Sequence, residues 1–150
     1  MSVEVSGGGE IPYGGKLVLF VCVENAGRSQ MAEGFGKNLG LACFSAGTKP
    51  ASNVYPVVIG AMREKGIDVS KNKPTLITPE MLDRAELIVT MGCQLEQLCP
   101  RPMIASLQKK VLAWDIDDPK NKSITEVRRI RDAIESKVKE LSTSALTLSA

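Results

Sequence analysis

Apolar residues gather in short unbroken runs along the chain, and these runs predict buried strands. The clearest run covers residues 17–23 (LVLFVCV), which is apolar throughout. An apolar run without polar alternation is typical of a strand covered on both faces, so this one belongs near the centre of a sheet. Similar runs predict further strands at residues 41–46, 87–91 and 111–114.

Between these runs, apolar residues recur at the three- and four-residue spacing of helices. The longest example follows Ser123, a capping residue, with apolar positions at Ile124, Val127, Ile130, Ile134, Val138 and Leu141. Other helices are predicted at residues 29–39 and 54–65, which are followed by Gly40 and Gly66, and at the short Thr78-Pro79-Glu80 start signal.

Strands that alternate with helices predict a parallel sheet, because parallel neighbours need crossovers and these cover both faces. We expect a three-layer α/β/α fold around a central four-stranded parallel sheet, in one domain over residues 16–141. Glycine-rich residues 1–15 predict a flexible lead-in, with a short strand at residues 2–5 as an alternative, and residues 142–150 predict a frayed tail.

Composition narrows the classes of function. The chain has 19 basic and 17 acidic residues, a net charge of +2, which is too small to imply nucleic acid or a membrane surface as a partner. Neither a membrane-spanning run nor a signal peptide is evident. We expect a soluble, cytoplasmic, monomeric protein, whose four cysteines are thiols rather than structural disulfides.

The sequence contains no histidine. This absence excludes histidine-based triads, histidine metal motifs and cysteine–histidine pairs, so any reactive cysteine must be ionised by other groups. No Cys-x2-Cys spacing is present, and we expect no metal site built from the four cysteines.

Cys22 stands where the first strand ends, at the edge of the sheet where chemistry collects in parallel α/β folds. Five residues separate it from Arg28, enough for a loop that curls and turns its N–H groups toward one point. The start of the next helix and the Arg28 guanidinium favour an anion there, including the ionised thiol. The predicted oxyanion-binding residues are Val23, Glu24, Asn25, Ala26, Gly27, Arg28 and Ser29.

The stretch VCVENAGRSQMAEGF resembles the active-site loop of the low-molecular-weight protein tyrosine phosphatase superfamily, and within it the thioredoxin-coupled arsenate reductases. The likeness continues through FSAGTKPASNVYPVVIGAMREKGIDVS, AELIVTMGC and WDIDDPKNKS, so it covers residues 16–141. It implies the corresponding phosphatase-like fold and an oxyanion substrate, either arsenate or a phosphate ester.

The resemblance also implies residue roles. Cys22 matches the nucleophile, Arg28 the oxyanion clamp, Asn25 the residue that shapes the loop, and Ser29 the hydroxyl that bonds the thiolate. Asp118 matches the general acid, which must protonate the departing oxygen.

The Asp-Asp-Pro stretch at residues 117–119 has a simpler interpretation as a turn, because Asp before Pro is common in turns. Asp117 is the residue that could be confused with the acid. Asp118 is preferred because it directly precedes Pro119, as in the family.

A reductase needs further thiols, and Cys93 and Cys99 follow the predicted strand at residues 87–91. By analogy, Cys93 forms a disulfide with Cys22 as arsenite leaves, and Cys99 then pairs with Cys93 for reduction by thioredoxin. The alternative is that one of the two is a buried thiol and the other a surface residue without a role. Cys43, within an apolar strand, is interpreted as packing.

Three departures from the family pattern bear on this choice. The interval between Cys93 and Cys99 is one residue shorter than in the reductases, and Glu24 puts a carboxylate in an anion-binding loop, where we expect it to point out to solvent. Lys120 stands where phosphatases carry an aromatic residue, and only 4% of the chain is aromatic, which provides poorly for a phosphotyrosine pocket. The balance favours the reductase.

Two alternatives remain open: a phosphatase that acts through a phosphocysteine, and a catalytically silent module that binds an oxyanion or a partner. The resemblance implies no required cofactor. It does imply an optional potassium ion near the loop, at positions that correspond to Asn25, Glu33, Ser45 and Asp68.

Overall fold

The computed structural model describes residues 17–92 and 111–149. Cys93, Cys99, the lead-in and the alternative strand at residues 2–5 lie outside the described residues. The helices and strands, in chain order, are β1 (Val18–Cys22), α2 (Arg28–Asn38), β2 (Cys43–Gly47), α3 (Pro56–Arg63), α4 (Pro79–Arg84), β3 (Leu87–Met91), β4 (Val111–Trp114) and α6 (Ile124–Ser149).

The four strands form one parallel sheet in the order β2-β1-β3-β4. The strand that carries Cys22 is therefore central, as its unbroken apolar run predicts. In the register, Cys22 lies beside Gly47, at the carboxyl ends of β1 and β2. The expected four-stranded parallel α/β/α architecture is confirmed.

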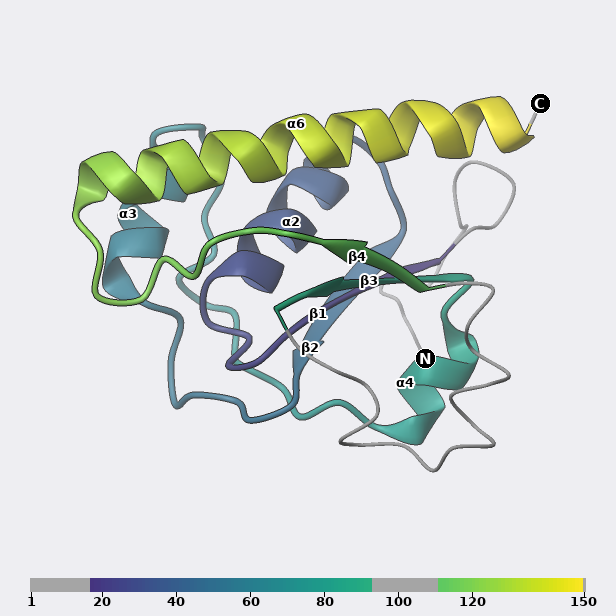
Figure 1. Ribbon diagram of the computed structural model, residues 1–150, viewed down its shortest axis with the longest axis horizontal. Coiled ribbons are helices and arrows are strands. Elements are labelled where there is room, and N and C mark those ends of the chain that lie inside the picture. The colour runs from purple at the N-terminus through teal and green to yellow at the C-terminus, as the bar shows by residue number, and fades with distance from the viewer. Residues whose placement is uncertain (1–16, 93–110, 150) are drawn as a thin grey trace.

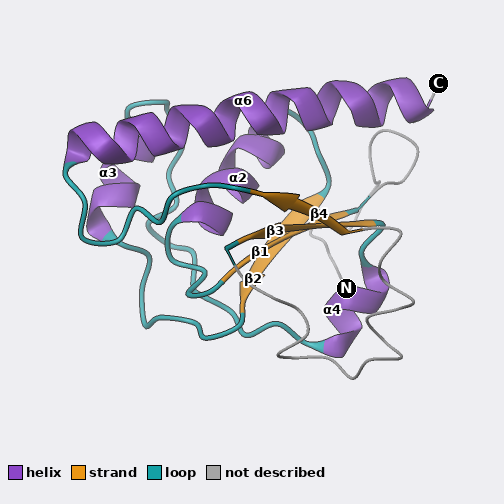
Figure 2. Ribbon diagram, in the orientation of Figure 1, coloured by secondary structure: helices purple, strands orange, loops and turns teal. Residues whose placement is uncertain are grey.

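Helices cover both faces of the sheet (Figures 1 and 2). Helices α2, α3 and α6 lie on one face and α4 lies on the other. Alternate side chains of β1 point to opposite faces of the sheet. Val18 and Phe20 belong to the core under α2, α3 and α6, whereas Leu19 and Val21 pack with α4 residues such as Leu82. Because β1 is buried on both faces, its carboxyl end is held firmly.

Helix boundaries follow the local signals with small shifts. Helix α3 begins at Pro56 rather than at residue 54, since proline occupies its first turn. Thr78 caps α4 and accepts a hydrogen bond from Met81 N. Helix α6 continues to Ser149, beyond Leu141, the last apolar position of the predicted pattern. Residues 142–149 contain neither glycine nor proline, the residues that most readily end a helix.

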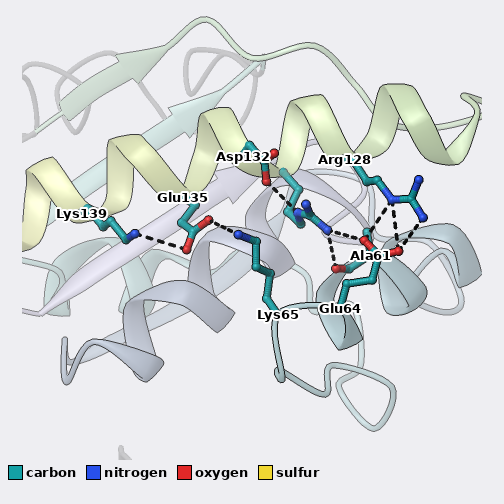
Figure 3. Close-up of polar contacts among 8 residues, drawn as sticks. Ala61, Glu64, Lys65, Arg128, Asp132, Glu135 and Lys139 are labelled. Carbon is teal, nitrogen blue, oxygen red and sulfur yellow. Dashed lines mark hydrogen bonds and ion pairs between the residues drawn. The ribbon is translucent and has the colours of Figure 1, made fainter.

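Ion pairs fasten α6 to the carboxyl end of α3 (Figure 3). Glu64, directly after α3, accepts hydrogen bonds from Arg128 at 2.7–3.1 Å and from Arg131 at 2.6 Å. The buried Arg131 also donates to Ala61 O at 3.0 Å. Lys65 pairs with Glu135 at 3.1 Å. No helix within the described ranges is long and apolar enough to cross a membrane.

These contacts make stability depend on pH through Glu64. Hydrogen bonds from Arg128 and Arg131 lower its pKa to about 2 from an ordinary value of 4.5. A lowered carboxyl pKa stabilises the fold fully above about pH 4.5, and the contribution disappears as the pH falls through 2.

We therefore expect the native chain to melt at a higher temperature than Glu64→Gln at pH 7, and the gap to close as the pH falls from about 4.5 to 2. Salt should narrow the gap at pH 7, because Glu64 and Arg128 are both exposed. Glu140→Gln, which removes an exposed carboxylate from α6, is the matched control. A constant gap across this pH range would contradict the assignment.

Candidate active site

The loop that follows Cys22 turns its carbonyl oxygens outward. The carbonyls of Cys22, Val23, Glu24 and Ala26 accept hydrogen bonds, at 2.7–3.2 Å, from the N–H groups of the neighbouring segment, namely those of Thr48, Lys49, Ala51 and Tyr55. The negative ends of these peptide dipoles are thus bonded away from the loop interior. This is the arrangement that an anion nest requires, and α2 begins at its far end with Arg28.

Asn25 holds the loop in its curl. Its φ of 51° lies in the left-handed region that asparagine tolerates, as predicted. The buried side chain donates from Nδ2 to the hydroxyls of Ser29 (2.6 Å) and Ser45 (3.0 Å). Its Oδ1 accepts from Thr75 N at 2.9 Å and from Gln30 Nε2 at 3.3 Å. All the polar groups of this side chain are therefore used in fixing the loop.

Ser29 lies against the cysteine sulfur. The Cys22 Sγ to Ser29 Oγ distance is 2.9 Å, and both residues are buried. The Ser29 oxygen also accepts a hydrogen bond from Asn25 Nδ2, so the hydroxyl links the cysteine sulfur to the side chain that shapes the loop. The Ser29 hydroxyl therefore holds the Cys22 sulfur in place, in a chain that contains no histidine.

Arg28 is largely buried. Its side chain is 9% exposed, and it donates to Ile116 O at 3.1 Å. Gly92 also lies close to Arg28: its φ is +76°, and an added Cβ there would come within 2.4 Å of the Arg28 NH1 atom. Only glycine permits both this conformation and this approach. Sequence reasoning missed Gly92; its one signal is a glycine directly after a buried strand.

Asp118 is the carboxylate that faces the arginine. Its Oδ2 lies 3.7 Å from Arg28 NH2, and its Oδ1 accepts a hydrogen bond from Lys120 N at 3.0 Å. Asp117 instead lies 3.6 Å from Arg129, on α6. The structure thus brings Asp118, not its neighbour, to the oxyanion loop.

The following proline is in contact with the loop itself. An added Cβ at Gly27 would lie 2.7 Å from Pro119 Cγ and 3.3 Å from Tyr55 Cε2. The Asp-Pro segment therefore packs directly on the anion-binding loop, which is more than a surface turn would require.

Glu24 corrects one expectation. Its side chain does not extend freely into solvent, because it accepts hydrogen bonds from the Tyr55 hydroxyl and, at 2.9 Å, from Lys120 Nζ. These two bonds, from Tyr55 first and Lys120 second, lower the pKa of Glu24. Burial, and then the neighbouring carboxylate, raise the pKa of Tyr55. The carboxylate points away from the anion nest because two partners outside the loop hold it.

Cys43 lies in the core, as expected for a packing residue. Burial raises the pKa of its thiol well above the usual range, and its Sγ contacts Glu33 O at 3.6 Å. A protonated, buried thiol has no nucleophilic role.

Of the four positions expected to bind potassium, three come together. Asn25 donates to Ser45, and Ser45 donates to Glu33 at 2.5 Å. The other Glu33 oxygen, however, pairs with the Lys37 ammonium at 2.6 Å, which supplies the positive charge a cation would bring. Asp68 is exposed and accepts from Ser70 N at 2.9 Å. This arrangement does not fit a potassium ion, so we assign it no step of the reaction.

The fold and the loop define the class of protein. The family described as low molecular weight phosphotyrosine protein phosphatase matches residues 17–148, and the chain belongs to it. Among individual relatives, an arsenate reductase of Brevibacillus brevis is 38% identical over 128 residues, covering 83% of this chain and 92% of the relative. Arsenate reductase 2 of Staphylococcus haemolyticus is 36% identical over 131 residues, covering 85% and 97%.

Solved structures give the same fold. An arsenate reductase in the phosphate-binding state is 32% identical, with a TM-score of 0.74, and the match covers 87% of this chain and 98% of that one. A YwlE arginine phosphatase with a phosphorylated active-site serine is 26% identical, also with a TM-score of 0.74, covering 85% and 94%. The chain is thus similar both to reductases and to phosphatases.

Proposed function

We propose that this protein is an arsenate reductase in which Cys22 is the nucleophile, Arg28 the oxyanion clamp and Asp118 the general acid. The observation that carries the proposal is the convergence of the Ser29-bonded sulfur, the buried guanidinium and the Asp118 carboxylate on one anion-binding loop. The relatives named arsenate reductase support the choice of substrate.

In the first step the Cys22 thiolate attacks arsenic, and one As–O bond breaks. Asp118 donates its proton to the departing oxygen, which leaves as water, while the loop and Arg28 bind the remaining oxygens. The product is a Cys22–arsenic(V) adduct. No electrons have yet been transferred.

In the second step the Cys93 thiolate attacks the Cys22 sulfur. An S–S bond forms, the S–As bond breaks, and its electron pair reduces arsenic(V) to arsenite. Cys99 then attacks Cys93, which frees Cys22 and leaves a Cys93–Cys99 disulfide for a thioredoxin-like donor in the cytoplasm. Chain connectivity supports this assignment, because Cys93 directly follows Gly92, which lies against Arg28.

A second candidate is a phosphatase that works through a phosphocysteine, since the same three residues suffice for it. The similarity to an arginine phosphatase structure favours keeping this alternative. Lys120, at the position after Asp-Pro, argues against an aromatic wall for phosphotyrosine.

Two assays on the purified chain distinguish the two candidates: thioredoxin-linked arsenate reduction and hydrolysis of an aryl phosphate. Arsenate turnover that depends on thioredoxin supports the proposal; phosphate release alone replaces it, and neither activity indicates a silent binding module.

The relay itself is tested by Cys99→Ser. We expect this variant to complete about one turnover per protein molecule and then stop, because the Cys22–Cys93 disulfide has no thiol to resolve it. Quenched-flow measurement of arsenite gives the burst, and Cys43→Ala is the matched control that should cycle normally. Undiminished cycling of Cys99→Ser with thioredoxin would remove Cys99 from the relay.

A further inference from the structure

Three side chains form a closed contact at the rim of the site. We call Glu24, Tyr55 and Lys120 the rim latch. Glu24 belongs to the oxyanion loop, Tyr55 precedes α3, and Lys120 lies in the connection between β4 and α6. The Glu24 carboxylate accepts from the Tyr55 hydroxyl with one oxygen and from Lys120 Nζ, at 2.9 Å, with the other. Residues 96 positions apart are joined in this way.

The latch is partly shielded from water. The Glu24 side chain is 30% exposed and that of Lys120 is 47% exposed. Tyr55 also packs close to Gly27, so its ring fixes the direction of the hydroxyl. A carboxylate oriented by a second, neutral donor loses less entropy on pairing than a free surface carboxylate, which makes this pair stronger than an ordinary exposed one.

The latch is continuous with the proposed general acid. Lys120 N donates to Asp118 Oδ1 at 3.0 Å, and Pro119, between these two residues, packs on Gly27. Two further polar contacts join this segment to the loop, from Arg28 to Ile116 O and from Arg28 to Asp118 Oδ2, but both use Arg28, the group that an oxyanion recruits. The latch uses neither Arg28 nor the interior of the nest, so it persists when an oxyanion binds.

We propose that Glu24, through Lys120, is a positioning residue that holds the Asp118 segment on the oxyanion loop during the chemical step. This inference rests on the proposed function insofar as Asp118 is the acid. Without the latch, the Asp118 carboxyl samples positions from which it cannot reach the departing oxygen. Oxyanion binding, which depends on backbone N–H groups and Arg28, is unaffected.

The test uses Glu24→Gln, Lys120→Met and the double variant in the full-length chain, with whichever substrate the native chain converts, arsenate or aryl phosphate. Each single variant should lower kcat about threefold to tenfold, and the double variant should fall no further, because the second change removes a contact already lost. Lys122→Met removes a nearby exposed lysine charge and is the matched control; it should keep the native kcat.

Binding of inorganic phosphate, measured by calorimetry, separates positioning from general damage. Glu24→Gln should bind phosphate as tightly as the native chain or more tightly, because a negative charge beside the nest is gone. Weaker phosphate binding together with a lower kcat would show a disrupted loop and overturn the proposal. The proposal would also be overturned if the kcat losses of the two single variants multiplied in the double variant. An unchanged kcat in both single variants would overturn it as well.

Hydrogen exchange gives a reading that does not depend on activity. Peptides that cover residues 115–123 should exchange faster in Glu24→Gln than in the native chain, whereas Lys122→Met should show no change outside its own position. Equal exchange rates would overturn the latch even if the native chain converted neither substrate. If the proposed function is wrong, the native chain itself lacks arsenate turnover. If only the latch is wrong, the native chain is active and the variants do not differ from it as predicted.

Discussion

Cys22→Ser should abolish turnover of arsenate and of aryl phosphate, by about 10⁴-fold or more, while inorganic phosphate still binds. The serine hydroxyl is a far weaker nucleophile than a thiolate, and no histidine is present to activate it. The nest and Arg28 remain, so calorimetry should find phosphate affinity within a few fold of the native value.

The control for this substitution is Cys43→Ala, which removes the buried thiol of the strand beside β1 and should leave turnover in place. Retained turnover in Cys22→Ser would refute the nucleophile. Loss of phosphate binding in Cys22→Ser, with the fold intact by circular dichroism, would instead show that the thiolate holds the loop open.

Asp118→Asn should lower kcat by about 10²–10⁴-fold with little change in phosphate affinity. Asparagine keeps the size of the side chain and can still accept the hydrogen bond from Lys120 N, but it has no acidic proton to give to the departing oxygen. With aryl phosphates, the loss should shrink as the leaving group becomes more acidic, because such a group departs without protonation.

Asp117→Asn is the matched control, since that carboxylate faces Arg129 rather than the loop. It should keep the native rate. An unchanged rate in Asp118→Asn would show that the Asp-Asp-Pro segment is only a turn. The leaving oxygen would then need another proton source.

The two largest predictions separate the two enzymes from a silent binding module. A reductase and a phosphatase both lose turnover in the Cys22 and Asp118 variants, and they differ in whether Cys99 and thioredoxin are needed. A silent oxyanion-binding module would show no turnover to lose. Its phosphate affinity would depend on Arg28 and be insensitive to Asp118→Asn.

Much of the fold could be predicted from local patterns. The apolar run that ends on Cys22 predicted a central strand, and the helical spacing predicted the helices to within a few residues, because both depend on neighbours along the chain. The loop also has a local cause: Asn25 tolerates the left-handed turn, and small residues follow it. Helix α6 extends through residues 142–149, which contain neither glycine nor proline.

The direction of single side chains could not be predicted in this way. Glu24 was expected to face solvent, since the sequence shows only a carboxylate in an anion-binding loop; its partner Lys120 lies 96 residues away. The contact between Gly92 and Arg28 could not be predicted from the sequence. Nor could the hydrogen bond from Arg28 to Ile116 O, because these residues lie 88 positions apart.

The sequence by itself determined that a thiol ends a buried strand, that an anion-binding loop and a helix start follow it, and that no histidine takes part. Only the tertiary structure decided where the loop carboxylate points and which glycine makes room for the guanidinium. The physical reason is that periodicity and turn preferences act between residues a few positions apart. The contacts that aim these side chains form only when the carboxyl ends of parallel strands meet at one edge of the sheet.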